Sequence, residues 1–178
     1  EFQCGFDPYS TIRRSSCCRR QYGTAWKGSR LRMIKQEEGM EDVRVGLVHE
    51  AREKVTPAKS ASHIGSGSLQ VYSTPSMVSF VERTCHELLN PYLPDSMTSV
   101  GTHVDIEHLA PTPLGGSVRA RVEVVAVDGI LIDFTAEVWD DFELVGRSRH
   151  RRAVIDSDRF LQRVQKKHAQ QLQDEDPE

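Results

Sequence analysis

The stretch that decides the fold is Ser73-Thr74-Pro75-Ser76-Met77-Val78-Ser79-Phe80-Val81-Glu82-Arg83-Thr84-Cys85-His86-Glu87-Leu88-Leu89-Asn90-Pro91. Thr74 is expected as the N-cap, because its hydroxyl can accept a bond from an amide of the first turn. Pro75 suits the first helical position, where φ is already set and no N–H is needed. Asn90 precedes a proline, which pushes it out of the helical region. The stretch therefore predicts one long helix.

This helix has one apolar face with a carboxylate in it. At about 100° per residue, the apolar sector holds Val78, Val81, Cys85, Leu88 and Leu89. The opposite side holds Ser76, Arg83 and Glu87. Glu82 lies about 40° from Val78, inside the apolar sector. Burying an unpaired carboxylate costs several kcal/mol, so Glu82 is interpreted as neutral, paired or functional. A carboxylate at the margin that reaches water, or a buried structural pair, is the plainer alternative.

Composition excludes several classes of protein. The chain has 178 residues, a net charge of −3 and a pI near 6.2, so no global charge favours nucleic acid or a membrane surface. It has no apolar run of about 20 residues, as a membrane span needs. The spacing of Cys4, Cys17, Cys18 and Cys85 supports neither a zinc site nor a disulfide framework. A reducing, cytoplasmic location is expected.

Residues 1–43 lack sustained periodicity, and residues 11–35 are rich in Lys and Arg without any Asp or Glu. They are interpreted as a disordered basic segment. Part of a transit peptide is the alternative, and it would place the protein in the mitochondrial matrix. Basic and aromatic residues together are a weak signal for RNA, so no nucleic-acid partner is expected.

Alternating residues predict strands on both sides of the helix. Residues 43–55 predict a first strand. Residues 58–70 are rich in Ser, Gly and Ala, and predict a mobile connection that could serve as a lid. Residues 117–127 and 130–138 predict a hairpin joined at Asp128-Gly129.

The strand over residues 100–108 carries a second candidate residue. One face holds Val100, Thr102, Val104, Ile106 and His108. The other face holds Gly101, His103, Asp105 and Glu107. The first face is apolar and should face the core. His108 is either a satisfied core histidine or a site residue, since sites gather where strands meet loops.

Residues 142–155 predict the last strand, with a row of basic side chains: Arg147, Arg149, His150, Arg151 and Arg152. It is either an edge strand protected by charge or a cationic rim for a phosphorylated ligand. Residues 156–158 cap a final amphipathic helix, and residues 166–178 predict a polar tail.

A strand, a long helix and four antiparallel strands predict a sheet wrapped around that helix. The fold class is therefore α+β, with the hotdog architecture. The domain is expected over residues 44–165.

Several separate motifs resemble a known family. They are residues 73–78 with Glu82, then residues 91–94, 98–102, 108–115 and 146–155. In order and spacing they resemble the fluoroacetyl-CoA thioesterase-like branch of the hotdog superfamily, over roughly residues 45–165. The resemblance implies a homodimer with acyl-CoA sites at the subunit interface and thioester hydrolysis as the activity. It implies no cofactor, because coenzyme A is part of the substrate.

The resemblance also implies site residues. The family's catalytic positions fall on Thr74, Glu82 and His108. Its substrate-binding positions fall on Gly101 and Arg152. The first helical turn, at Pro75 and Ser76, is expected to bind the thioester carbonyl through free amides and the positive end of the helix dipole.

The expected roles follow from side-chain chemistry. Glu82 is the general base for water or the nucleophile, strengthened by apolar surroundings. His108 orients Glu82 or water and protonates the leaving thiolate. Thr74 positions water or the carbonyl, or acts as a nucleophile assisted by His108. An Arg of the last strand is expected to hold the CoA phosphates.

The sequence departs from the family at the lid. The family's namesake selects fluoroacetyl groups with apolar aromatic side chains, whereas residues 58–72 contain no Phe and only Tyr72 as an aromatic. A small or medium acyl-CoA is therefore the expected substrate. Two other functions stay open. A non-catalytic acyl-CoA-binding module would keep the fold, and an enoyl-CoA hydratase would need an Asp/His pair, which Asp105 does not offer readily.

Overall fold

The computed structural model describes residue 40 and residues 42–174. The predictions for residues 1–39, including three of the cysteines, lie outside the described residues. The elements in chain order are β1 (Val48–Lys54), η1 (Pro57–Lys59), α1 (Ala61–Ile64), α2 (Thr74–Leu89), η2 (Asn90–Tyr92), β2 (Met97–His108), β3 (Ser117–Asp128), β4 (Leu131–Trp139), β5 (Leu144–Asp156) and α3 (Ser157–Asp174). No helix in this part of the chain has the length and apolar character needed to cross a membrane.

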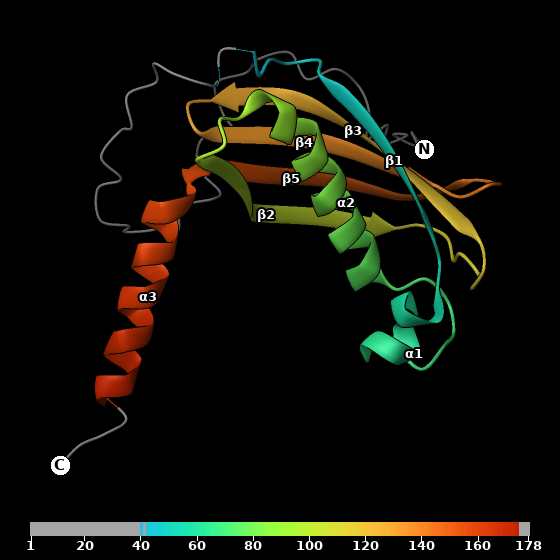
Figure 1. The fold of residues 1–178 in the computed structure, drawn as a ribbon. Coiled ribbons are helices and arrows are strands. Elements are labelled where there is room, and N and C mark those ends of the chain that lie inside the picture. The colour runs from blue at the N-terminus through green and yellow to red at the C-terminus, as the bar shows by residue number, and fades with distance from the viewer. Residues whose placement is uncertain (1–39, 41, 175–178) are drawn as a thin grey trace, which may run out of the picture. The chain divides into compact units, whose positions relative to one another are not determined.

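The five strands form one antiparallel sheet in the order β1-β3-β4-β5-β2. The long helix α2 lies across one face of this sheet (Figure 1). The predicted α+β fold, a sheet around a central helix, is confirmed.

The core lies between α2 and the middle of the sheet. The sheet contributes Val118, Ala120, Val122, Val124, Ile132, Phe134, Ala136 and Val138. The helix contributes Met77, Phe80, Val81, Cys85, Leu88 and Leu89. Each large side chain buried in this way stabilises the fold by about 1.5–3 kcal/mol relative to an exposed one. This packing fixes α2 against the sheet, and so fixes every polar group that α2 carries.

Ser73, rather than Thr74, caps α2. The Ser73 Oγ atom accepts a hydrogen bond from the Ser76 amide at 3.2 Å and donates to the Ser76 hydroxyl at 2.8 Å. Ser and Thr are both good N-caps, and the prediction of Thr74 as the cap was wrong by one residue. The predicted outward position of Ser76 was also wrong. Its side chain is buried, and its hydroxyl bonds the Lys59 carbonyl at 3.1 Å.

A bulge in β2 changes which residues face the helix. Gly101 lies opposite Arg152, but His103 lies opposite Arg151, so one extra residue sits between them on β2. Such a bulge inverts the alternation of side chains along the strand. The predicted placement of Gly101 on the face opposite His108 was therefore wrong. Gly101 and His108 both lie on the face that α2 covers.

The basic strand β5 lies inside the sheet, between β4 and β2. Its interpretation as an edge strand was therefore wrong. Its side chains divide between the two faces. Arg151 is exposed and forms two hydrogen bonds with Asp133, at 2.6 and 2.9 Å, whereas Arg152 is buried on the side of α2.

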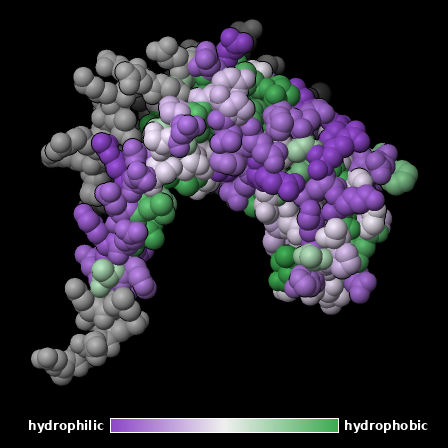
Figure 2. All heavy atoms as spheres, in the orientation of Figure 1, coloured by the Kyte–Doolittle hydropathy of each residue, from purple (hydrophilic) through white to green (hydrophobic). Residues whose placement is uncertain are grey.

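Other boundaries also differ from the predictions. The first strand begins at Val48, because the chain takes a left-handed turn at Gly46, where φ is 90°. Helical turns η1 and α1 occupy much of the predicted loop before α2. Helix α3 continues to Asp174, where a tail was expected from residue 166. Hydrophobic residues lie beside hydrophilic ones along α3 (Figure 2), and the exposed apolar ones include Phe160, Leu161 and Val164.

Candidate active site

Thr74 and His108 form a hydrogen-bonded pair. Thr74 is the first residue of α2 and His108 is the last residue of β2. The distance from Thr74 Oγ1 to His108 Nδ1 is 2.9 Å. The capping role of Ser73 leaves the Thr74 hydroxyl available for this bond. When Nδ1 is unprotonated it accepts from the hydroxyl, which is the arrangement of a nucleophile and its base.

The His108 ring is held in a partly apolar setting. Tyr72 approaches it edge-on, with 6.4 Å between ring centroids and 73° between planes. The His108 Nε2 atom is buried and has no hydrogen-bond partner among the described residues. Desolvation lowers the pKa of His108, and a bond with the Ala110 backbone opposes this in part. Burial therefore favours the neutral imidazole, the form that can accept a proton.

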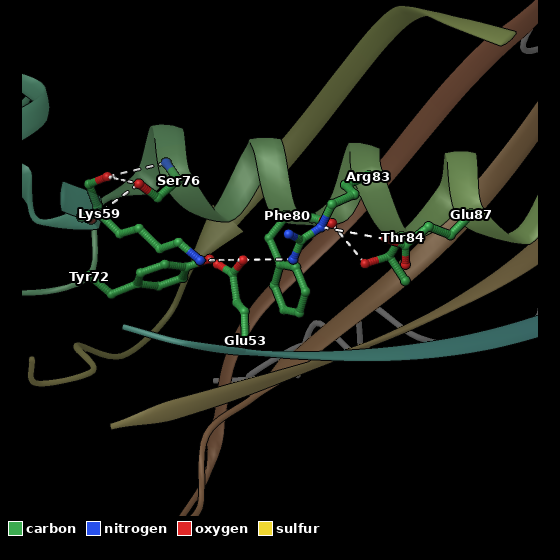
Figure 3. A network of polar contacts seen from close by, with 9 residues as sticks. Glu53, Lys59, Tyr72, Ser76, Phe80, Arg83, Thr84 and Glu87 are labelled. Carbon is green, nitrogen blue, oxygen red and sulfur yellow. Dashed lines mark hydrogen bonds and ion pairs between the residues drawn. The ribbon is translucent and has the colours of Figure 1, made fainter. Parts of the chain in front are cut away.

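A buried carboxylate fixes the segment that leads into α2. Glu53 of β1 is contacted by Lys59 Nζ at 2.6 Å, by Arg83 Nη2 at 2.7 Å and by the Tyr72 hydroxyl at 2.8 Å (Figure 3). Burial, and then Glu53, raise the pKa of Tyr72, so its hydroxyl stays protonated and donates. Glu53 thus connects β1, η1 and α2, and it fixes the ring that packs against His108.

Glu82 lies apart from this pair. It follows Thr74 by eight residues in the same helix, which is about 12 Å along the axis. Its carboxylate lies beside Gly101 of β2 and 3.8 Å from His150 Nε2, with 41% of the side chain exposed. Glu82 is therefore at the margin of the buried face. The expected orientation of Glu82 by His108 does not occur within this chain, since the contacts of Glu82 in the described part are with other residues.

Gly101 makes room for the Glu82 carboxylate. A β-carbon at this position would overlap Glu82 Oε1 and would lie 3.1 Å from His150 Cε1. Gly146 has a comparable role at the other end of α2, because a β-carbon there would overlap the Met77 sulfur atom. Two glycines thus let the helix approach the β2 and β5 strands closely.

His150 is a site residue that the sequence analysis missed. It was counted in the row of basic residues, although it shares its strand face with Arg152 and points under α2. It is only 2% exposed, and its Nδ1 atom lies 2.8 Å from the His103 carbonyl oxygen. Burial lowers its pKa, with the His103 carbonyl opposing and Arg152 adding to the decrease. The alternation along β5 together with the known face of Glu82 was the signal that would have found it.

Arg152 of β5 is buried and forms hydrogen bonds with both β2 and α2. Its Nε donates to Ser99 Oγ at 2.9 Å, its Nη2 to the Ser99 carbonyl at 2.7 Å, and its Nη1 to the Glu82 carbonyl at 3.2 Å. Burial lowers its pKa. These bonds use its donors inside the protein, which leaves the guanidinium poorly placed for a CoA phosphate. Its contact with the substrate stays a prediction.

The first turn of α2 offers fewer free amides than expected. Pro75 has no N–H, and the Ser76 amide is bonded to Ser73. The predicted binding of substrate at Pro75 and Ser76 stays a prediction. Of Thr74, Pro75 and Ser76, Thr74 is the residue that combines an exposed position with a reactive hydroxyl group. No group of three or more His, Cys, Asp or Glu side chains suited to a metal ion occurs among the described residues.

Comparison with known proteins shows the family of the chain. The family model for FlK, the fluoroacetyl-CoA-specific thioesterase, matches residues 55–158. The fluoroacetyl-CoA thioesterase of Streptantibioticus cattleyicolor is 30% identical over 119 residues, which are 64% of this chain and 86% of that protein.

Solved structures agree with the sequence comparison. A crystal structure of an FlK mutant is 29% identical, covers 70% of this chain and 97% of its own, and superposes with a TM-score of 0.67. A thioesterase-superfamily protein of Thermus thermophilus, at 21% identity, covers 73% of this chain and 98% of its own with a TM-score of 0.67, which shows the shared fold. The match of the family model over more than half of the chain shows the family. The chain therefore belongs to the family of fluoroacetyl-CoA-specific thioesterases and is a thioester hydrolase of the hotdog fold.

Proposed function

We propose that this chain hydrolyses the thioester of a small or medium acyl-CoA, with Thr74, His108 and Glu82 as its catalytic residues. The observation that carries the proposal is the 2.9 Å contact between Thr74 Oγ1 and His108 Nδ1 at the start of α2. It supports a hydroxyl activated by a neutral imidazole. A related FlK structure, 29% identical to this chain, contains fluoroacetate and CoA.

In the proposed reaction the thioester carbonyl lies at the N-terminal end of α2. The Thr74 oxygen attacks the carbonyl carbon while His108 Nδ1 takes the hydroxyl proton. The positive end of the helix dipole stabilises the developing oxyanion. The carbon–sulfur bond then breaks, and the imidazolium returns its proton to the CoA sulfur. Water attacks the acyl carbon on Thr74 while a carboxylate takes a proton from the water. The bond between the acyl carbon and Thr74 Oγ1 then breaks, the proton passes to Oγ1, and the free acid leaves.

Glu82 is the carboxylate proposed for the step with water. Its side chain is 41% exposed and so is open to a water molecule. It is about 12 Å from Thr74 along the helix axis, which is too far for a direct hydrogen bond. A homodimer, in which a second chain completes the site, would relieve this separation. Support for the homodimer comes from the exposed Thr74–His108 pair and from β2, which lies at the edge of the sheet and exposes Val104.

The acyl group is proposed to be small or medium without restriction to fluoroacetyl. Tyr72 is the only aromatic residue in the segment of residues 58–72. Its ring is 1% exposed and its hydroxyl is bonded to Glu53, so it is not a free side chain of a lid. Fluoroacetyl selection, as the names of the relatives describe for them, is thus not proposed for this chain.

The test measures thiol release from a panel of acyl-CoAs, from fluoroacetyl and acetyl to longer and aryl chains. Wild type and Glu82→Gln are compared side by side. If Glu82 is the base, the variant should lose at least about 100-fold in turnover. Near wild-type turnover in Glu82→Gln would remove this residue from the role. Binding of a non-hydrolysable acyl-CoA, with no release from any thioester of the panel, would instead support a binding module.

A further inference from the structure

Arg152 is hydrogen-bonded to the main-chain oxygen of the proposed base, Glu82. Arg152 Nη1 lies 3.2 Å from the Glu82 main-chain oxygen. The guanidinium is buried, with Arg152 only 6% exposed. A guanidinium that instead formed a bidentate pair with the carboxylate would make it a weaker base. A contact that prevents this ion pair therefore keeps the Glu82 carboxylate basic enough for its proposed role.

The protonation of His150 follows from its two contacts. Its Nδ1 faces the His103 carbonyl oxygen at 2.8 Å, and a carbonyl only accepts, so Nδ1 carries the proton. Its Nε2 lies 3.2 Å from Arg152 Nη1, and an arginine only donates, so Nε2 presents its lone pair. Burial, which lowers the pKa of His150, favours the same neutral state. The ring is therefore a neutral acceptor for Arg152.

The other groups around this site do not replace that acceptor. Helix α2 contributes Cys85, whose pKa burial raises to about 12, and His86, whose Nδ1 is 3.5 Å from Ser99 Oγ. Strand β2 contributes His103 through its carbonyl, and β4 contributes the Phe134 ring, 6.4 Å from the His150 ring. Among the described groups, His150 is thus the side chain that competes with the Glu82 carboxylate for Arg152 Nη1.

We infer that His150 is a positioning residue: by accepting a hydrogen bond from Arg152 Nη1, it acts together with Ser99 and the Glu82 main-chain oxygen to keep the guanidinium from pairing with the Glu82 carboxylate. The inference rests on the proposed role of Glu82 as a base. The His150 Nε2 atom also lies 3.8 Å from Glu82 Oε1, beyond hydrogen-bond distance, and in this scheme His150 touches neither the reacting water nor the acyl group. It acts by controlling where a buried positive charge points.

Two substitutions with opposite consequences test this inference. His150→Asn can reproduce the bond to the His103 carbonyl, but its side chain is too short to reach Arg152. His150→Gln can reach Arg152 and offer it an oxygen. In the Asn variant, Arg152 is expected to turn to Glu82. The component of the acid limb of the kcat/KM profile that Glu82→Gln removes should then move to lower pH by about one to three units, with a lower kcat, while the component due to His108 stays in place. In the Gln variant the acid limb should stay near that of wild type.

The controls separate this inference from the proposed function. His63→Asn, in the exposed helix α1, should leave the profile unchanged. An equal loss of Tm in both His150 variants, with an unmoved acid limb, would mean a structural role and would overturn the inference. If Glu82→Gln keeps the wild-type turnover and acid limb, the role of Glu82 fails instead, whatever the His150 variants do. Should His150→Asn not fold, a shifted limb in His150→Gln would by itself contradict the inference.

Discussion

Gly101 and Glu82 occupy the same small space between β2 and α2, so that a single added methyl group at Gly101 would overlap the Glu82 carboxylate oxygen. The contact joins the middle of the long helix to the edge strand of the sheet. It follows that Gly101 determines where the proposed base can lie.

Gly101→Ala should therefore displace the Glu82 carboxylate from β2. We expect kcat to fall by about 10-fold or more, since misplacing a catalytic group by an ångström is costly. The assay is thiol release under saturating substrate, with Tm measured in parallel. Gly67→Ala is the matched control, because a β-carbon there would meet only Ala61 Cβ at an ordinary 3.5 Å. Unchanged kcat in Gly101→Ala would show that the position of Glu82 does not limit turnover.

Thr74→Ala should remove the hydroxyl that bonds His108, and turnover should fall by about 100-fold or more. Thr74→Ser keeps a hydroxyl and should retain a substantial part of the activity. Ser79→Ala, at an exposed position of the same helix, is the control. Equal activity in the Ala and Ser variants would argue that Thr74 only shapes the site.

Buried His150 and partly buried His108 should make the protein less stable in acid. Burial lowers the pKa of both His108 and His150 below the ordinary value of 6.5. The unfolded chain therefore binds protons first as the pH falls below 6.5, and the free energy of unfolding decreases until the folded-state pKa values are passed. Above pH 6.5 this contribution is fully present. The effect is measured as the difference between the free energies of unfolding from urea titrations at pH 7.5 and at pH 5.

The same pH dependence should weaken when a histidine is removed. His150→Gln lacks one of the two titrating groups, so its loss of stability between these pH values should be smaller than that of wild type. His63→Gln, which alters an exposed histidine, is the control. An identical loss in wild type and His150→Gln would contradict the assignment of His150 as a buried neutral group.

Glu53→Gln should destabilise the segment that leads into α2. The Glu53 side chain is 7% exposed, whereas Lys59 and Arg83 are 30% and 48% exposed and can turn toward water. We therefore expect a loss of about 1–3 kcal/mol in the free energy of unfolding, as for hydrogen bonds to charged groups. Glu50→Gln breaks an exposed pair with Arg119 and should cost less than about 1 kcal/mol. Chemical unfolding of both variants decides the comparison.

The sequence was sufficient for the arrangement of the core. The apolar sector of α2 and the alternation in β3 and β4 are regular, and regular patterns predict buried faces directly. The hairpin at Asp128-Gly129 follows from turn chemistry, and it joins β3 to β4 as predicted. Two of the three catalytic candidates, Thr74 and Glu82, lie in α2, whereas His108 lies at the end of β2, and the family resemblance connected the three.

The sequence was insufficient where tertiary structure decides between equal local choices. Ser73 and Thr74 are both good caps, and in the fold Ser73 caps the helix while Thr74 bonds His108 of β2. A row of basic residues suits either an edge strand or an inner strand, and the order of the strands decided for β5. His150 was predicted as one more member of that row, because its contacts with residues of α2 cannot be derived from the sequence of β5 alone.

The bulge in β2 makes the length of this strand as consequential as its composition. Thr102, the extra residue, donates a hydrogen bond to the Arg151 carbonyl at 3.2 Å. Because its side chain is exposed, many side chains can replace it. Deleting it would remove the bulge and place Gly101 six residues before His108, an even spacing that keeps both on one face, whereas deleting a residue between His103 and His108 would turn His108 to the other face. We therefore expect this strand to tolerate substitutions, and even loss of the bulge residue, but not the insertion or deletion of one residue between His103 and His108. The spacing from His103 to His108 should accordingly be better preserved among active relatives than the identities of the residues between them.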